Sequence, residues 1–192
     1  MISSQNGPVS RTDNTPAVMS EGLSQGVAMV NDVRAFQRAG AIEAVRDSDA
    51  LLCVMHMQGE PDSMQDAPTY GGVVEDVKAF LRERVFVLQA AGVQHSRVVL
   101  DPGFGFGKTL EHNFSLLKHL NEFEQLGVPV LVGMSRKSMI GGILNKPVEE
   151  RLVGSVAAAL LALERGASIL RVHDVAPTMD ALKIWSATQA AT

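Results

Sequence analysis

Five short apolar segments, each ending in polar residues, alternate with amphipathic segments of helical length along this chain of 192 residues. Near-continuous apolar strands are typical of a parallel sheet, and strands that alternate with helices place those helices on the outside of the sheet. The expected strands cover residues 27–33, 51–57, 97–101, 129–134 and 167–174. The expected helices cover residues 16–26, 41–48, 73–91, 110–126, 148–165 and 176–187. The first 15 residues are polar, and we expect them to be irregular.

The composition fits one globular domain over residues 1–192, because 46% of the residues are hydrophobic and 20% are charged. The net charge is −4 and no basic block occurs, which argues against a nucleic-acid surface. The start lacks the pattern of a signal peptide, and the longest uncharged apolar run, 152–163, is too short to span a bilayer. We therefore expect a cytoplasmic protein without a membrane partner, in which the only cysteine, Cys53, is buried and reduced.

A loop with a glycine at every second position follows the third apolar segment, in the run Asp101-Pro-Gly-Phe-Gly-Phe-Gly-Lys108. A nucleotide P-loop needs a glycine where Pro102 stands, and a dinucleotide loop needs one where Lys108 stands, so both interpretations fail. An ordinary tight strand-to-helix loop would also account for the glycines. The alternative is a strand end that carries an acid and a flexible, aromatic-lined loop, which is where α/β folds hold ligands.

Every expected strand ends in polar side chains at its carboxyl end. They are Asn31, His56, Asp101, Arg136 with Lys137, and Arg171 with His173. Each alone has an ordinary explanation, such as a turn cap, a core histidine or a solvated arginine. A doubly wound sheet concentrates its site at one switch point, whereas a (β/α) barrel gathers groups from many strand ends. The repetition over five strands favours the barrel.

The side chains restrict the ligand. Asn31 and Asp101 can bind the amino-pyrimidine edge of a flat heterocycle, with a lysine at its carbonyl or ring nitrogen. Phe104 or Phe106 can flank a ring. No zinc-site spacing and no Ser-His-Asp arrangement is evident in the sequence.

Two further features concern an anion and a loop. Arg171 and His173 stand two apart on an expected strand, hence on one face, and suit a phosphate or pyrophosphate. Residues 58–70 form a long polar loop with two prolines, which we expect to act as a lid.

Five motifs in order, with compatible spacing, resemble those of dihydropteroate synthase from about Pro16 to the end of the chain. They are Met29-Val-Asn-Asp-Val33, Met55-His-Met-Gln-Gly59, Leu100-Asp-Pro-Gly-Phe-Gly-Phe-Gly-Lys108, Val132-Gly-Met-Ser-Arg-Lys-Ser138 and Leu170-Arg-Val-His-Asp-Val175. The resemblance implies an α/β protein of the TIM (β/α)8 barrel family. It also implies a transferase of folate biosynthesis that joins 6-hydroxymethyl-7,8-dihydropterin pyrophosphate to p-aminobenzoate and releases pyrophosphate with the help of Mg²⁺.

The same resemblance assigns the pterin site. Asn31, Asp101 and Lys137 would bind the pterin, and Met55 and Gly133 would line its pocket. No residue of this chain is assigned as a metal ligand.

The remaining site residues belong to the other substrate groups. Arg171 would pack on the pterin ring and, with His173, hold the pyrophosphate. Phe106, Ser135 and Lys137 would border the aminobenzoate pocket, where sulfonamides compete. Lys137, Arg171 and His173 are the side chains expected to act in catalysis.

The chain departs from the family pattern near its start. The first two strand-loop units of the family are absent, and Thr12-Asp13 stands where Asp-Thr is expected, which moves the pterin-binding aspartate by one residue. A TIM barrel needs roughly 250 residues. We therefore expect an N-terminally truncated, incomplete barrel of five strands plus at most a remnant of another, stabilised by association, as in a homodimer. The alternative to an active enzyme is a catalytically silent fragment or interaction module with a partial pterin site.

Overall fold

Six parallel strands make up the sheet in the computed structural model, which describes residues 9–59 and 68–191. The strands, which are neighbours in chain order, are β1 (Ser10–Thr12), β2 (Met29–Asp32), β3 (Leu51–Met55), β4 (Val98–Asp101), β5 (Val130–Val132) and β6 (Ala167–Leu170). The helices are α1 (Pro16–Ser24), α2 (Ala41–Val45), α3 (Val73–Ala90), α4 (Leu110–Lys118), α5 (Ser138–Leu144), α6 (Leu152–Leu163) and α7 (Val175–Gln189). Sequential order is the arrangement of a (β/α) barrel, because a doubly wound sheet reverses its order at a switch point.

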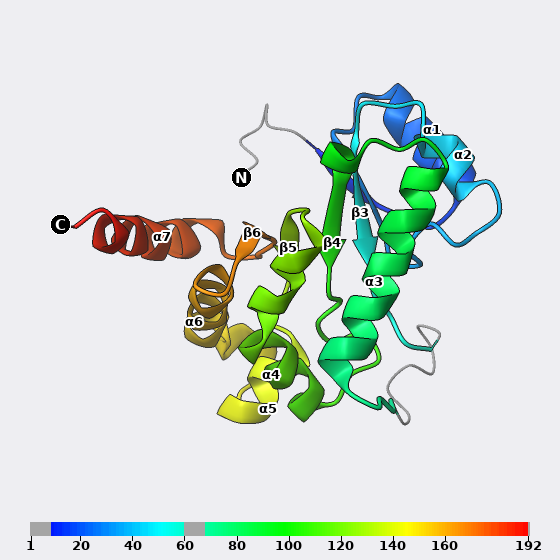
Figure 1. Ribbon diagram of the computed structural model, residues 1–192. Coiled ribbons are helices and arrows are strands. Elements are labelled where there is room, and N and C mark those ends of the chain that lie inside the picture. The colour runs from blue at the N-terminus through cyan, green and yellow to red at the C-terminus, as the bar shows by residue number, and fades with distance from the viewer. Residues whose placement is uncertain (1–8, 60–67, 192) are drawn as a thin grey trace.

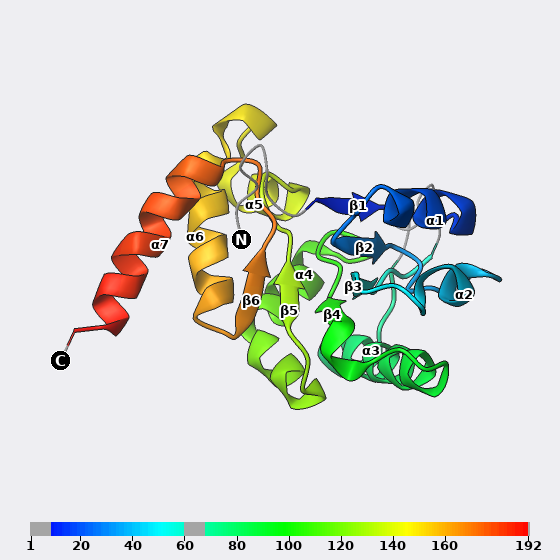
Figure 2. The ribbon, with the colours of Figure 1, turned by 90° about the horizontal axis from the view of Figure 1, so that it is seen from above.

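The sheet is curled but not closed. Seen from above, the strands follow an arc with helices around its outside (Figure 2). In the described residues β1 and β6 are the two edges and do not pair with each other, while α7 lies beyond β6 in both views (Figures 1 and 2). The fold is therefore an incomplete TIM barrel. No helix in the described part of the chain has the length and apolarity needed to cross a bilayer.

The main core lies between the outer face of the sheet and the helices. Leu52, Val54 and Leu100 point outward from β3 and β4 and are fully buried, as are Val77 and Leu81 of α3. Burial of these side chains is the main source of stability in such a layer.

A second, smaller cluster covers the inner face. Cys53, Val99 and Leu131 come from three adjacent strands and are at most 1% exposed. The expectation that Cys53 is buried is confirmed, and burial raises the pKa of this free thiol well above its ordinary value. Since side chains alternate along a strand, the residues two positions beyond this cluster also face inward.

All five expected strands are present, each shorter than predicted. The prediction that residues 1–15 are irregular is wrong for Ser10–Thr12, which pairs in parallel with β2 and forms the expected remnant of a sixth strand. The prediction of a lid over residues 58–70 falls largely on residues 60–67, which lie outside the described residues.

Two predicted helices are interrupted. The expected helix 110–126 is α4 followed by a 3-10 helix, Leu120–Leu126, with a break at His119. Within α4, Leu116 and Leu117 are buried, whereas Phe114 is 36% exposed. The expected helix 148–165 is a 3-10 turn, Val148–Glu150, followed by α6.

Helix α5 was not predicted. Its Gly141 and Gly142 weaken the helical pattern, because glycine disfavours a helix interior. A Cβ at Gly141 would overlap the guanidinium of Arg151, so the glycine makes room for this side chain in its present position.

Truncation of the α3 core contact tests the layer arrangement. We expect Leu81→Ala, at a fully buried position, to lower the free energy of unfolding by about 2–5 kcal/mol through lost burial and a residual cavity. Phe86→Ala on the same helix, at a side chain 69% exposed, should change it by less than about 1 kcal/mol. Urea unfolding followed by circular dichroism measures both. Equal effects of the two substitutions would contradict the assigned face of α3.

Candidate functional site at the carboxyl ends of the strands

Strand register brings most of the predicted site residues to one place. Met55 pairs with Asp101, and Asn31 pairs with Cys53, two residues before Met55 on the same face. The backbone N–H of Arg171 donates to the carbonyl of Val132, which aligns Arg171 with the end of β5. The inner face of β2 to β6 therefore ends in a polar rim.

Asn31 and Asp101 carry buried oxygen atoms with incomplete partners. The Oδ1 atom of Asp101 accepts the N–H of Gly103 at 2.8 Å. Its Oδ2 atom has no hydrogen bond and lies 3.5 Å from Nη2 of Arg171, and the Oδ1 atom of Asn31 also has none. Buried polar atoms without hydrogen bonds are uncommon and call for a ligand or another explanation.

Arg171 lies against Gly133. A Cβ at Gly133 would stand 2.8 Å from the Nη2 atom, so the missing side chain makes room for the guanidinium. A cavity of about 130 Å³ opens there, with all its lining residues from the ends of β5 and β6. They are Gly133, Ser135, Lys137, Arg171, Val172 and His173.

The Lys137 ammonium points toward the glycine loop. Its Nζ donates to the carbonyl of Phe104 at 2.5 Å and lies 4.5 Å from the ring centroid of Phe106. Burial lowers the pKa of Lys137 to about 8, with the Asp101 carboxylate opposing the shift and Arg171 adding to it. The Lys137 amine therefore donates a hydrogen bond, and its protonation state changes at a pH only slightly above neutral.

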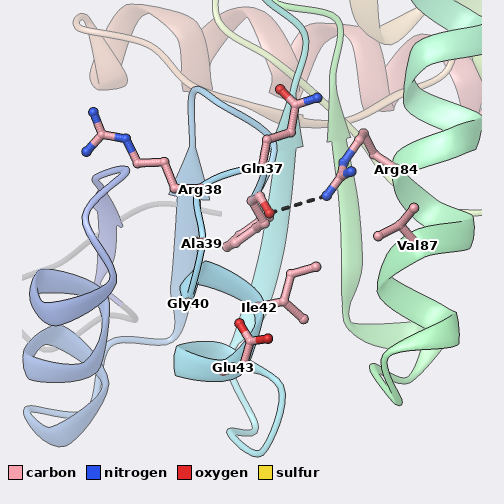
Figure 3. A pocket seen from close by; sticks show the side chains of 9 residues that line it. Gln37, Arg38, Ala39, Gly40, Ile42, Glu43, Arg84 and Val87 are labelled. Atoms are coloured by element: carbon pink, nitrogen blue, oxygen red, sulfur yellow. Dashed lines mark hydrogen bonds between the residues drawn. The ribbon is translucent and has the colours of Figure 1, made fainter.

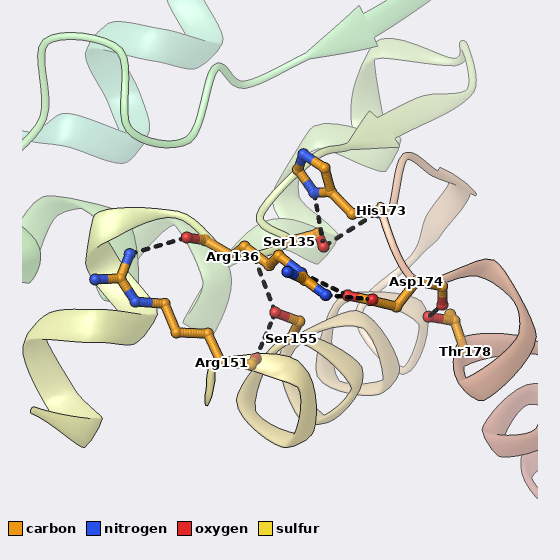
Figure 4. A network of polar contacts seen from close by, with 7 residues as sticks. All are labelled: Ser135, Arg136, Arg151, Ser155, His173, Asp174 and Thr178. Atoms are coloured by element: carbon orange, nitrogen blue, oxygen red, sulfur yellow. Dashed lines mark hydrogen bonds and ion pairs between the residues drawn. The ribbon is translucent and has the colours of Figure 1, made fainter. Parts of the chain in front are cut away.

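Ser135 joins the two last strand ends. Its Oγ accepts the backbone N–H of His173 at 3.2 Å and lies 3.1 Å from Nδ1 of the same residue (Figure 4). Arg171 and His173 follow the end of β6, so the prediction that they share one face of a strand is wrong; they line the same cavity from a loop. Of the two phenylalanines, Phe104 is fully buried in the core, and Phe106 is the half-buried ring beside the site.

His56, a predicted strand-end group, supports the loop instead of a ligand. It is 6% exposed, its ring meets the ring of Phe80 edge-on, and its Nδ1 lies 3.0 Å from Nζ of Lys108. Burial and the Lys108 charge lower the pKa of His56 to about 3, so the ring is neutral and Nδ1 is an acceptor.

The structural role of Lys108 was not predicted. In the sequence this residue only excluded a dinucleotide-binding loop, because it stands where such a loop needs a glycine. Its buried Nζ donates to the carbonyls of Gly103 at 2.9 Å and Phe106 at 3.0 Å. Burial lowers its pKa to about 7. A Cβ at Gly103 would overlap the carbonyl oxygen of His56, so this glycine, at φ +70°, cannot carry a side chain. Lys108 thus fixes the glycine loop to the end of β3.

Asp13 does not join this site through its carboxylate. Thr12 pairs with Asn31, so Asp13 falls on the other face of the sheet. The Oδ1 atom of Asp13 accepts the N–H of Thr15 at 2.8 Å at the start of α1, where Pro16 takes the first helical position as predicted.

A larger cavity, of about 360 Å³, lies between residues 36–43 and α3 (Figure 3). The side chain of Arg84 donates to the carbonyls of Ala35 and Phe36, which stand at positive φ. None of the predicted site residues lines it. This arginine stabilises a strained turn.

An open parallel (β/α) sheet with a polar rim at its carboxyl ends defines a barrel-type protein that binds its ligand at that rim. The pterin binding enzyme family matches residues 9–173, and the chain belongs to this family.

The relatives agree with this assignment. The chain is 49% identical over 180 residues to dihydropteroate synthase from Haemophilus influenzae and 45% identical over 183 residues to that from Escherichia coli. These matches cover 94% and 95% of this chain but 66% and 65% of the two relatives, so the chain spans about two thirds of their length.

Solved structures are similar to the same extent. Dihydropteroate synthase from Xanthomonas albilineans in complex with 7,8-dihydropteroate has a TM-score of 0.91 at 46% identity, over 96% of this chain and 68% of that one. The Yersinia pestis enzyme in a sulfonamide drug complex has a TM-score of 0.94 at 43% identity, over 98% and 69%.

The lowered pKa of Lys108 should make the free energy of unfolding depend on pH. Its pKa is about 7 when folded and about 10.5 ordinarily, so between these values the unfolded chain binds a proton that the folded chain does not. Stability should therefore rise with pH in this range, and Lys137 adds to the rise above about pH 8. Lys108→Met should reduce the slope by up to about 1.4 kcal/mol per pH unit.

The control is Lys118→Met, at an exposed lysine of α4. Chemical unfolding at pH 7, 8, 9 and 10 measures the slopes. At pH 10, where the protonation penalty of Lys108 has nearly disappeared, Lys108→Met should cost about 1–3 kcal/mol, because the carbonyls of Gly103 and Phe106 lose a donor. Parallel curves for Lys108→Met and wild type would disprove the assignment.

Proposed function

We propose that the chain acts as a dihydropteroate synthase, which condenses 6-hydroxymethyl-7,8-dihydropterin pyrophosphate with p-aminobenzoate to give 7,8-dihydropteroate and pyrophosphate. The observation that carries this proposal is a pair of buried acceptors without hydrogen bonds, Oδ1 of Asn31 and Oδ2 of Asp101, on one face of the sheet. The amino-pyrimidine edge of a pterin supplies N–H donors for such acceptors.

Four further residues contribute to the proposed pterin site. Lys137 can turn its ammonium from the Phe104 carbonyl to the carbonyl or ring nitrogen of the pterin. Met55 gives the site an apolar floor, and the missing side chain of Gly133 makes room for the Arg171 guanidinium, which would pack on the pterin ring. The Xanthomonas albilineans relative, solved with 7,8-dihydropteroate, supports this choice of ligand.

The reaction is a displacement at the pterin methylene carbon. The p-aminobenzoate nitrogen forms a bond to this carbon, the carbon–oxygen bond to pyrophosphate breaks with its electron pair, and the amine loses a proton. Arg171 and His173, which line one cavity, neutralise the leaving group. Positioning of two substrates accounts for much of the acceleration, and no covalent enzyme nucleophile is required.

The aminobenzoate side of the site is formed by Phe106, Ser135 and Lys137. The ring of Phe106 lies under the Lys137 ammonium, and Ser135 offers its hydroxyl beside them. A sulfonamide would compete for this side, and the Yersinia pestis relative, solved in a sulfonamide drug complex, supports that inference.

Magnesium is implied by the resemblance, and we propose that it binds together with the pyrophosphate group of the substrate. Among residues 9–59 and 68–191 no three His, Cys, Asp or Glu side chains gather to hold a metal ion. We assign no residue of this chain as a metal ligand. Mg²⁺ commonly binds through substrate phosphates with few protein ligands, so it is a variable of the assay.

The alternative is a catalytically silent fragment or interaction module with a partial pterin site. The outward position of Asp13 favours it, because the site then lacks a carboxylate from β1. Pterin binding without condensation, with and without Mg²⁺, would support this alternative over the enzyme.

Substitution of the site lysine tests both versions of the proposal. We expect Lys137→Ala to weaken binding of the pterin pyrophosphate by about 100-fold and to abolish condensation, because a buried charged donor is lost. Lys118→Ala, at an exposed lysine, should bind as wild type. Calorimetry measures the binding, and release of pyrophosphate measures the reaction. Unchanged affinity in Lys137→Ala would remove this residue from the site.

We also propose a cytoplasmic homodimer. Large apolar side chains are exposed on the adjacent helices α6 and α7, with Val153 at 79%, Leu161 at 44% and Ile184 at 71%. A second copy of the chain would cover them. The buried, free thiol of Cys53 suits a reducing compartment.

Sedimentation of a surface variant tests the association. Ile184→Asp should shift the protein toward monomer, because a carboxylate would be buried in the interface. Phe86→Asp, equally exposed but on α3, should leave the mass unchanged. A monomeric wild type would refute the dimer.

A further inference from the structure

Arg136 stands in a backbone conformation that disfavours its side chain. The N–H of Lys137 donates to the carbonyl of Met134 at 3.1 Å, which closes a four-residue turn with Arg136 at its third position. Its φ is 58°, and a third turn position with positive φ is usually glycine or asparagine. The residues on either side, Ser135 and Lys137, are two of the six that line the cavity.

Three groups hold the strained residue. Its backbone N–H donates to Oγ of Ser155 at 2.9 Å, and its carbonyl accepts Nη1 of Arg151 at 2.9 Å. Its side chain forms a two-pronged pair with Asp174, from Nε to Oδ2 at 2.9 Å and from Nη2 to Oδ1 at 2.6 Å (Figure 4). The pairing raises the pKa of Arg136 and lowers that of Asp174.

Asp174 connects this turn to the end of β6. It immediately follows His173, whose N–H and ring both meet Ser135, and its carbonyl accepts the hydroxyl of Thr178 in α7. Its carboxylate makes no capping bond to α7, although the residue stands at the N-cap. The carboxylate is therefore used for Arg136 and not for the helix.

We propose that the Arg136–Asp174 pair is a positioning device, which holds a strained turn so that Ser135 and Lys137 face the cavity in register with His173. Neither residue of the pair lines the cavity itself. Backbone strain is maintained where the surroundings over-determine it, and two-pronged arginine–carboxylate pairs fix orientation better than single contacts do. The ligand part of this inference rests on the proposed function.

The variants separate positioning from stability. Arg136→Gly suits a positive φ but removes the pair, Arg136→Lys keeps the charge without the two-pronged geometry, and Asp174→Asn removes the charge. The matched control is Asp180→Asn, which removes an exposed carboxylate paired with Lys183 on α7.

Two measurements report on the geometry of the site. The first is the titration of the Lys137 amine by NMR of labelled lysine side chains, which needs no substrate. In wild type its pKa is about 8, and in the three pair variants we expect a shift toward the ordinary 10.5 as the ammonium leaves its buried position. The second is binding of the pterin pyrophosphate, which we expect to weaken by about 10-fold or more. The double variant of Arg136→Gly and Asp174→Asn should weaken it no further than either substitution alone.

The control decides the outcome. If the pair variants match Asp180→Asn in the Lys137 titration, the proposal is overturned, whether or not the chain binds the pterin. If the titration shifts while wild type fails to bind the pterin pyrophosphate, the positioning role stands and the proposed function fails. Thermal melting is measured alongside, and if the variants that keep the wild-type melting temperature show no titration shift, the proposal is also overturned.

Discussion

The pairing of Met55 with Asp101 is the constraint on which the site depends. Side chains alternate along every strand, so the register of β2, β3 and β4 decides which of their residues face inward, whereas the pairing of β5 with β6 shifts between Val130 and Leu131. Asn31 and Asp101 share the inner face because of it, and the apolar cluster around Cys53 lies on the same face. Arg171 follows the end of β6 and is aligned with β5 by its N–H bond to the Val132 carbonyl. Function and inner packing are therefore set by the same hydrogen-bond ladder.

The glycine loop after β4 contains a second organising interaction. In a phosphate-binding loop the backbone N–H groups point toward the ligand. In this loop the carbonyls of Gly103 and Phe106 point inward and accept hydrogen bonds from the Lys108 side chain. The neutral ring of His56 accepts from the same ammonium. The buried Lys108 side chain thus organises the loop, and its bond to the Phe106 carbonyl fixes the backbone of the residue whose ring lies beside Lys137.

The sequence predicted the order of the strands and most of the rim, because apolar runs and polar strand ends are local patterns. It could not predict α5, whose glycine at 141 is explained only by a contact with Arg151. It also could not separate His56, which supports the loop, from Asp101, which keeps an unbonded oxygen. That distinction depends on which partner each side chain meets across the fold, and spacing along the chain does not contain it.

Asp13 and Arg136 show how local backbone geometry limits the composition of a site. One residue of displacement turns the Asp13 carboxylate to the helix side, where it binds the N–H of Thr15. Arg136 is likewise turned away from the cavity, by a positive φ, and the residues flanking it face the site as a consequence. A residue type in the expected motif is therefore not enough to assign a role. The face on which its backbone places it decides whether it binds the ligand or holds the residues that do.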